Sequence, residues 1–581
     1  MQQLLITILS LILFADGAIV KTSFGSVEGT DVENFRSFRK VPFAKPPIGK
    51  LRFQKPEKPD KWKGILNAKE YGPACMSNSS TTSSPQKWVD EDCLHVNIFT
   101  SENCLKSKNC AVIVYIHGGE MLYDSAVMFN DTVIFDAFAS RDVVLVIPAF
   151  RLGIFSHFVV KDQSVAPNNL GLFDIVHGLE FVKSEIHHFG GSNKNITLLG
   201  HSYGAHVVST LQFSTKVNRD MSLFQKSVSM STVLYFDTFE LQIEKTKRFV
   251  DHANCSVPLG LTKKLSEKQH DYLVMKCLQK KDALELLRIQ RILEDAGFPA
   301  YDGHIIREPL IQEVSLAQLF ETPQKMPTMV GCTSLELDKF MAYHDISKAM
   351  GYKNYEECDE KYRRDKKKKN FDFEGHADET LAIIAQTQLK TNKLLENKVP
   401  TYLYEYSYPK HASHTDDLSY LFGVHSFEQD ENEAHLSEVY RNMFVNFAKY
   451  GNPGNGFIKT NLENSSYFDV YWNENTGARP TMKDGFERKM NNYFLGEMVE
   501  FDRNVTAFKK SKSVKVPTAR FFNEISDHDQ LPYMYISLLL ISLIFFTGCI
   551  VGKICCTGPN ERHLYIQLDG NDHDWTTVKN F

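Results

Sequence analysis

The chain of 581 residues carries little net charge: its formal charge at pH 7 is −5 and its pI is near 6.5. It therefore has no global basic surface, and this excludes nucleic acid as a main partner. The one dense basic run, residues 361–370, is read as a solvated loop or helix face. The sequence also lacks internal repeats, and it has no low-complexity linker before residues 509–530. Residues 18–510 are thus expected to form one large domain.

Apolar segments lie at both ends of the chain. Residues 1–17 have the length of a signal peptide, with the small residues Ala15 and Gly17 around the expected cut, although no basic residue precedes the apolar stretch. Residues 533–551 are uncharged, and at about 1.5 Å per residue they are long enough to cross a bilayer. We therefore expect a secreted domain with a membrane anchor.

Charges around the second apolar segment set its orientation. Asp527 and Asp529 precede it and Lys553 and Arg562 follow it, so the positive-inside rule places the large N-terminal part outside the cytosol. The prediction is a single-pass type I membrane protein with this order: signal peptide 1–17, luminal or extracellular domain 18–510, juxtamembrane stalk 511–532, transmembrane helix 533–551 and cytoplasmic tail 552–581.

Sequons and cysteines agree with that topology. Six N-x-S/T sites lie in the predicted luminal part and none in the tail: Asn78, Asn130, Asn195, Asn254, Asn464 and Asn504. Local spacing among the luminal cysteines suggests three disulfides, Cys75–Cys93, Cys104–Cys110 and Cys255–Cys277, and it leaves Cys332 and Cys358 unassigned. These features are typical of an oxidising compartment.

Short apolar runs rich in β-branched residues recur along the luminal chain, at residues 111–116, 143–147, 196–199 and 401–406. The segments between them are long enough for helices. Fully apolar strands that alternate with helices indicate a mostly parallel sheet covered on both faces. The fold class predicted for residues 18–510 is therefore α/β.

The segment 196–208, "ITLLGHSYGAHVV", places Ser202 directly after one of these strands, in the pattern Gly-x-Ser-x-Gly with Gly200 and Gly204. A strand, a sharp turn and a helix in this order are typical of a nucleophile elbow. The turn leaves no room for side chains at the two glycines. An ordinary turn also fits so short a motif, so the assignment needs partner residues.

Partners follow in the order expected for an α/β-hydrolase. The strand that ends at Ile116 is followed by His117-Gly118-Gly119-Glu120, a loop of the type whose N–H groups form an oxyanion hole. Glu336 follows another strand, and His414 lies in a loop before an apolar run. The order Ser202, Glu336, His414 matches a Ser-Glu-His triad.

The chain resembles the type-B carboxylesterase and cholinesterase family over nearly the whole luminal domain. Residues 38–53, "FRKVPFAKPPIGKLRF", are similar to its N-terminal signature, and residues 91–99, "EDCLHVNIF", to its cysteine signature. Residues 168–182, "NNLGLFDIVHGLEFV", and 447–453, "FAKYGNP", follow the same pattern. The resemblance implies the α/β-hydrolase fold, with a large twisted sheet.

The resemblance also implies roles for the site residues. Ser202 is the nucleophile, His414 the general base, and Glu336 the group that orients the histidine. Gly118 and Gly119 shape the oxyanion loop, and the N–H groups of Gly119, Glu120 and Tyr203 face the oxyanion. No metal and no organic cofactor are implied. Assembly into a homodimer is left open.

Three residues depart from the family pattern. The family usually has a third glycine where Glu120 stands, and glutamate and alanine where His201 and Tyr203 flank the nucleophile. The Glu120 carboxylate would oppose the charge that develops on the oxyanion, and Tyr203 is bulkier than alanine. These departures predict a specialised acyl group or acceptor rather than fast, general ester hydrolysis.

Two functions of different classes fit the sequence. One is ester hydrolysis or acyl transfer on a small-molecule ester, as in membrane-anchored nematode carboxylesterase homologues, some of which esterify sugar-based molecules. The other is a cell-adhesion receptor similar to neuroligins, which commonly lack the nucleophile. Cholinesterase activity fits less well, because Ser83 stands where the choline-site tryptophan is expected and Trp88 is out of place. The intact triad favours the enzyme.

The predicted tail contains Tyr565 and Leu568 in a Tyr-x-x-apolar pattern, which resembles sorting signals that coat adaptors bind. This pattern predicts passage through endosomes or a lysosome-related organelle, with the cell surface as the alternative.

Overall fold

The computed structural model describes residues 17–77, 88–232, 234–338, 346–368, 373, 375–454 and 456–513. The chain divides into two compact units, residues 1–505 and 506–581, and the candidate site lies in the first. Within the described residues, no helix combines the length and the apolar character that crossing a bilayer requires. The predicted span and tail, the predicted stalk apart from residues 511–513, and all but Gly17 of the predicted signal peptide lie outside these residues.

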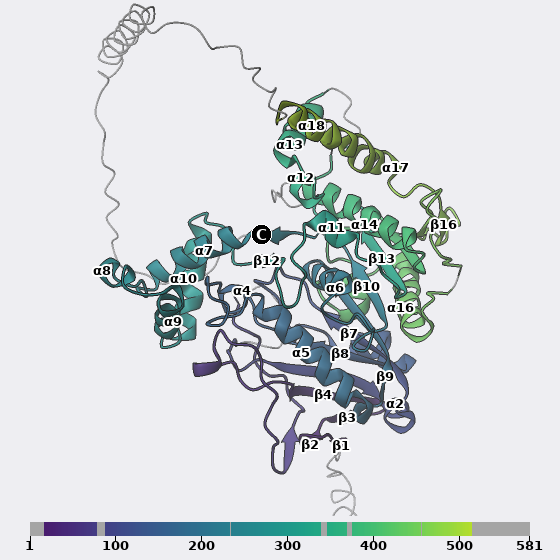
Figure 1. The fold of residues 1–581 in the computed structure, drawn as a ribbon. Helices are drawn as coiled ribbons and strands as arrows, with labels where there is room; N and C mark the ends of the chain where they lie inside the picture. Colours follow the sequence, from purple (N-terminus) through teal and green to yellow (C-terminus); the bar gives the residue numbers. More distant parts are fainter. Residues whose placement is uncertain are drawn as a thin grey trace, which may run out of the picture. The chain divides into compact units, whose positions relative to one another are not determined.

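One mixed sheet of eleven strands organises the first unit (Figure 1). In spatial order its strands are β16 (Thr481–Lys483), β15 (Tyr467–Val470), β14 (Thr401–Tyr406), β13 (Thr328–Thr333), β10 (Lys226–Met230), β9 (Gly191–His201), β7 (Cys110–Ile116), β8 (Val143–Pro148), β6 (His95–Ser101), β4 (Phe35–Pro42) and β3 (Thr30–Val32). Neighbouring strands from β15 to β8 are parallel, and the pairs at both edges are antiparallel. The mostly parallel sheet is confirmed.

The four apolar runs of the sequence all lie in this sheet, in β7, β8, β9 and β14. Nearly every residue of β7 and all of β8 and β14 are buried, because helices and loops cover these central strands. The carboxyl ends of parallel strands meet at one edge of a sheet, and ligands of open α/β sheets bind there. The loops after β7, β9, β13 and β14 carry the residues that the sequence singles out.

Helices connect and cover the strands: α2 (Glu102–Ser107), α3 (Asp131–Ala137), α4 (Gly153–His157), α5 (Leu170–Glu185), α6 (Tyr203–Phe213), α7 (Phe239–His252), α8 (Leu259–Thr262), α9 (Glu267–Leu278), α10 (Ala283–Asp295), α11 (Leu316–Phe320), α12 (Ile346–Ala349), α13 (Tyr355–Lys366), α14 (Asp378–Glu396), α15 (Leu418–Phe422), α16 (Glu431–Tyr450), α17 (Arg488–Asn491) and α18 (Met498–Ser513). Helix α6 packs on β9 and β10, α14 on β13 and β14, and α16 on β7, β8 and β9.

Short 3-10 helices η1 (Gly49–Leu51), η2 (Ala139–Arg141) and η3 (Ile186–Phe189) and the π-helical turn η4 (Asn492–Glu497) complete the helical elements of the described residues. Two small sheets also form. One contains β1 (Ile19–Lys21), β2 (Ser26–Glu28) and β5 (Ile65–Asn67), and the other contains β11 (Phe236–Asp237) and β12 (His304–Ile305).

Two apolar cores stabilise this unit. The larger contains the central strands and the helices that cover them. The smaller lies between α4 and the helices α7 to α10, which Figure 1 shows gathered beside the sheet, and it includes Phe53, Phe155, Phe249 and Tyr301. In the sequence, α7 to α10 lie between β11 and β12. Because these two strands pair with each other, the chain returns after α10 to the place where it left before α7.

All three suggested disulfides form: Cys75–Cys93, Cys104–Cys110 and Cys255–Cys277. Cys104–Cys110 closes the short loop between α2 and β7, and Cys255–Cys277 joins the segment after α7 to α9. The two unassigned cysteines, Cys332 on β13 and Cys358 on α13, are both buried.

Candidate active site

Ser202 lies at the turn between β9 and α6 and has φ 55° and ψ −124°. A positive φ is costly for a residue with a side chain and persists only where the surroundings enforce it. Two backbone bonds do so here: the Ser202 N–H donates to Met230 O at 2.9 Å, and its carbonyl accepts from His206 N at 3.0 Å. The serine is therefore presented on a strained turn, as the sequence predicts.

The two glycines of the elbow are required by close backbone contacts. A Cβ on Gly200 would lie 2.3 Å from the carbonyl of Gly204, at the start of α6. A Cβ on Gly204 would lie 2.0 Å from the carbonyl oxygen of Ile116, at the end of β7. The helix thus packs too tightly on the two strands for any side chain at either position.

The loop after β7 has three consecutive residues with positive φ: Gly119 at 86°, Glu120 at 54° and Met121 at 57°. Its turn is closed by Leu122 N and Tyr123 N, which both donate to Gly119 O at 2.8 Å. Gly118 lies against the elbow, since a Cβ there would be 3.0 Å from Ser202 Cβ. The loop is therefore next to the serine.

The three predicted oxyanion donors are the amides of Gly119, Glu120 and Tyr203. Within the part of the chain that the structure describes, none of them donates a hydrogen bond to another backbone group. They remain available to a ligand. The loop is supported from below by His117, whose Nδ1 lies 2.9 Å from Gly118 O and whose ring stacks on Phe150.

Glu336 follows β13 and is completely buried. Its Oε2 lies 2.5 Å from Nδ1 of His414, while its Oε1 accepts hydrogen bonds from Ser231 Oγ at 2.6 Å and Thr333 N at 2.8 Å. The His414 N–H also donates to the Glu336 carbonyl at 2.6 Å. Side chain and backbone together fix the histidine loop on the end of β13.

The electrostatic surroundings favour a charged His414. Burial alone would lower the pKa of His414, but the charge and hydrogen bond of Glu336, with smaller effects of Asp417 and Glu120, raise it above its usual 6.5. Asp417 is itself buried and accepts from Tyr440 Oη at 2.9 Å. Burial and the nearby Glu336 raise the pKa of Asp417 to about 7.

Tyr203 points away from the reacting centre. Its hydroxyl donates to Asp302 O at 2.6 Å and lies 3.3 Å from His304 Nδ1, on the segment around β12. Its ring is 4.5 Å from that of His206, centroid to centroid. The tyrosine therefore connects the elbow to β12, a role that the sequence alone did not indicate.

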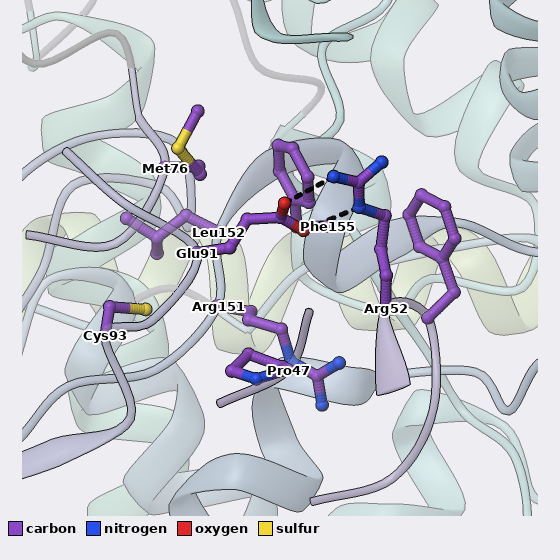
Figure 2. A pocket seen from close by; sticks show the side chains of 9 residues that line it. Pro47, Arg52, Met76, Glu91, Cys93, Arg151, Leu152 and Phe155 are labelled. Carbon is purple, nitrogen blue, oxygen red and sulfur yellow. Dashed lines mark hydrogen bonds and ion pairs between the residues drawn. The ribbon is translucent and has the colours of Figure 1, made fainter. Parts of the chain in front are cut away.

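A pocket outside this constellation is shown in Figure 2. Its walls include a buried ion pair between Arg52 and Glu91 and the aromatic ring of Phe155. Arg151, on the same wall, pairs with Asp174 through two bonds of 2.7 Å. Both arginines are paired with carboxylates, so their charges are neutralised. The pocket is therefore part of the structural framework beside α4, which contains Phe155.

Among the described residues, one group of three potential metal ligands lies close together, namely Cys104, Cys110 and Asp142. The two cysteines of that group form a disulfide, so their sulfurs are not thiolate ligands. The expectation of no metal and no cofactor stays a prediction.

The predicted glycosylation sites differ in their surroundings. Asn130, Asn254 and Asn504 are exposed. Asn195 lies in β9, where its Nδ2 donates to Lys449 O, and Nδ2 of Asn464 donates to Asp484. A glycan would take the place of these two bonds, so the exposed sites fit the modification better. Asn78, Ser83, Tyr565 and Leu568 lie outside the described residues.

Sequence reasoning assigned no contact at this site to three residues, although it noted His201 as a departure from the family pattern. Ser231 and Asp417 surround the Glu336–His414 pair, and His201 lies beside His414. Asp417 follows His414 at a distance of three residues, and on a turn this spacing predicts that the two side chains lie close together. Ser231 follows β10, the strand next to β9, and only the sheet order shows that it meets Glu336.

Comparison with known proteins gives one consistent result. The sequence profile described as "Carboxylesterase family" matches residues 16–384 and 353–501. Liver carboxylesterase 1F of Rattus norvegicus is 28% identical over 505 residues, which cover 75% of this chain and 86% of that protein. Gut esterase 1 of Caenorhabditis elegans is 31% identical over 332 residues, 56% of this chain and 55% of that protein.

Solved structures of the same fold include a thermophilic PNB esterase. It aligns with a TM-score of 0.66 and 23% identity, over 82% of this chain and 100% of that one. At this identity the likeness shows the fold and no finer property. The architecture of β3 to β16 is thus that of an α/β-hydrolase.

Proposed function

Because the chain belongs to the carboxylesterase family, and the relatives named above are esterases, we propose that Ser202, Glu336 and His414 form its catalytic triad. The observation that supports this proposal most is the position of His414. It is tied to the buried Glu336, and it lies beside the strained turn that presents Ser202. A carboxylate, an imidazole and a serine in this order can activate the serine for acyl transfer.

In the first half of the reaction, Ser202 Oγ attacks the ester carbonyl and His414 accepts its proton. Glu336 stabilises the imidazolium that forms, which agrees with the raised pKa of His414. The amides of Gly119, Glu120 and Tyr203 stabilise the oxyanion, and His414 then protonates the leaving alcohol. The acyl group is left on Ser202.

In the second half, an acceptor takes the acyl group from Ser202. Water gives hydrolysis and an alcohol gives acyl transfer, and we propose small-molecule esters, including glycoside-type metabolites, as substrates. Glu120 supports a specialised site. Its negative charge contributes to the raised pKa of Asp124 and of Asp302, behind burial and other nearby charges, so the carboxylate lies near both groups.

Labelling with a fluorophosphonate probe tests the triad. The wild-type ectodomain should be labelled, and Ser202→Ala or His414→Ala should abolish labelling while thermal unfolding remains cooperative. Equal labelling of wild type and Ser202→Ala would refute the assignment of the nucleophile. A folded wild type that is never labelled would favour the alternative, a neuroligin-like adhesion receptor, which needs no activated serine.

We further propose that the protein is a type I membrane protein anchored by residues 533–551 and that Tyr565 and Leu568 bind a coat adaptor. The catalytic domain would then face an acidic lumen or the cell exterior. Imaging of a tagged protein tests this, because Tyr565→Ala should shift it from acidic vesicles to the surface. Wild type and variant both at the surface would contradict the sorting proposal.

A further inference from the structure

His201, the residue before the proposed nucleophile, has no role in the mechanism above, although it lies at the centre of the site. Its side chain is almost completely buried. Its ring lies 4.7 Å from that of His414, centroid to centroid, with a tilt of 42°. The histidine is therefore a direct neighbour of the general base.

The same imidazole also lies beside the oxyanion loop and the nucleophile. A Cβ built on Gly118 would be 3.6 Å from His201 Nδ1 and 3.0 Å from Ser202 Cβ. One point of the loop is thus within reach of both side chains. An acceptor oxygen must approach the acyl carbon on Ser202 and His414 at once, and His201 borders that position.

One ring nitrogen of His201 lacks a partner. Nε2 is buried, and no group in the described part of the chain forms a hydrogen bond with it. A buried polar group left without a partner costs about 1–3 kcal/mol, and native proteins retain few of them. Nε2 is therefore open to a bond with a ligand or a water during turnover.

The charge state of His201 suits such a role. Burial first, and then the nearby His414 and His425, lower its pKa well below the usual 6.5, so the ring stays neutral. His414, whose pKa is raised, takes the proton of the pair. A neutral imidazole has one N–H donor and one nitrogen acceptor, so it can bind a hydroxyl group in either direction.

We propose that His201 binds the oxygen of the acyl acceptor in the second half of the reaction, and that this acceptor is a neutral hydroxyl compound, either water or an alcohol. The proposal rests on the function proposed above. The glutamate that the family usually has at this position can only accept a hydrogen bond when it is ionised, whereas the imidazole can also donate one. The substitution therefore adds a hydrogen-bond donor for the oxygen of an uncharged acceptor.

The step balances without a further reactant. The acceptor oxygen forms a bond to the acyl carbon, and its proton moves to His414. When the tetrahedral intermediate collapses, the bond from that carbon to Ser202 Oγ breaks, and Oγ takes the proton back from His414. His201 gains and loses no proton. It holds the acceptor oxygen within reach of His414.

Transfer of the acyl group from Ser202 to water or to glycerol tests the proposal, because this transfer occurs only in the step after acylation. The full-length protein in detergent is given an aryl ester with and without glycerol. The burst of phenol measures acylation, and the rates at which free acid and glycerol ester form measure transfer to each acceptor. For His201→Ala we expect a burst rate within about threefold of wild type, and rates of acyl transfer to water and to glycerol each lower by about tenfold or more, the size of one lost hydrogen bond.

Two further variants make the result specific. His201→Gln keeps a donor and an acceptor, so it should restore part of the transfer to water and to glycerol, and it serves as the readout if the alanine variant does not fold. His157→Gln is the matched control. His157 is another fully buried histidine whose Nε2 has no partner in the described residues, but its ring neighbours His304 rather than His414.

The outcomes separate this proposal from the one on which it rests. Rates of transfer to water and to glycerol that are unchanged in both His201 variants would overturn the role of His201 while leaving the triad intact. An equal loss of acylation and deacylation would also overturn it, because a structural role predicts that pattern. A wild type that is never acylated would instead refute the proposed function itself.

Discussion

Two histidines three residues apart in one loop each pair with a buried glutamate, but only one of them lies at the site. His411 Nδ1 is 2.5 Å from Glu433, and His414 Nδ1 is 2.5 Å from Glu336. Both glutamate side chains are inaccessible to solvent. By distance and burial of the carboxylate, the two pairs are the same.

Their surroundings separate them. Glu433 belongs to the capping box of α16, where it bonds to the N–H of Asp430, and the ring of His411 stacks on Phe427 at 3.7 Å. That pair fastens the loop to a helix terminus. The ring of His414 instead lies beside His201, next to the nucleophile turn. The position relative to the serine, rather than the histidine–carboxylate contact, supports His414 as the proposed base.

The largest expected effect comes from removing each histidine in turn. His414→Ala should lower kcat/KM for an aryl ester by about 10⁴-fold or more, the usual cost of losing a triad member. His411→Ala should retain activity within about tenfold, because its loss affects packing rather than proton transfer. Steady-state kinetics of the two purified variants measure the difference.

Thermal unfolding of the same variants is the control for folding. A similar large loss of activity in both, with both folded, would break the distinction between the pairs. Loss only in His411→Ala would reverse it, and His411 would then be the base.

The carboxylates should show the same contrast at a smaller magnitude. Glu336→Gln keeps the size of the side chain but removes the charge that stabilises the imidazolium, so kcat should fall by about 10³–10⁴-fold. Glu433→Gln removes the charge that pairs with His411, so it should lower the melting temperature. The effect should be limited, because Gln can still bond in a capping box, and kcat should change little. Equal kcat values for the two variants would contradict the assigned roles.

Much of this arrangement can be predicted from the sequence, and particular residues show which parts cannot. The apolar run at residues 111–116 and the Gly-x-Ser-x-Gly turn predict β7 and the elbow, because burial and backbone space act locally. The prediction of His414 uses the acidic residues and the apolar run that follow it, but both also follow His411, so local pattern does not separate the two histidines. Only tertiary structure brings Glu433 from α16 to His411.

Support for Glu336 was equally hidden. Ser231 is 105 residues away in the sequence, and it meets Glu336 because β10 and β13 are neighbours in the sheet. Tyr203 shows the reverse case. The sequence suggested that its bulk restricts the acyl site, whereas its hydroxyl bonds to Asp302 around β12. Side-chain direction depends on packing that no local pattern encodes.

A moderate effect is expected from Ser231, which donates to Glu336 but touches no substrate. Ser231→Ala removes one of the two bonds to Oε1, so kcat should fall by about tenfold with KM unchanged. Lys410→Ala, which removes an exposed lysine beside Glu433, is the matched change at the other pair and should leave kcat within about twofold. A KM effect of Ser231→Ala without a kcat effect would exclude a positioning role.

The smallest expected effect is a shift in the pH dependence of activity. Turnover needs neutral His414, so activity should fall as pH decreases through its raised pKa. The charge of Asp417 contributes to that rise, so Asp417→Asn should move the acid limb of the kcat/KM profile to lower pH, by less than about one unit. Asp416→Asn, in the same loop, is the control and should leave the limb in place.

The pH dependence of stability gives an independent test of the protonation state of Asp417. The pKa of Asp417 is raised to about 7, so the folded state binds its proton more tightly than the unfolded state does. This contribution to stability is present below the unfolded pKa of about 4 and is lost as pH rises through 7. The melting temperature of Asp417→Asn should therefore gain on that of wild type between pH 5 and pH 8. A gain that is the same at both pH values would show that Asp417 is ionised throughout, and the acid limb would then owe more of its position to this residue.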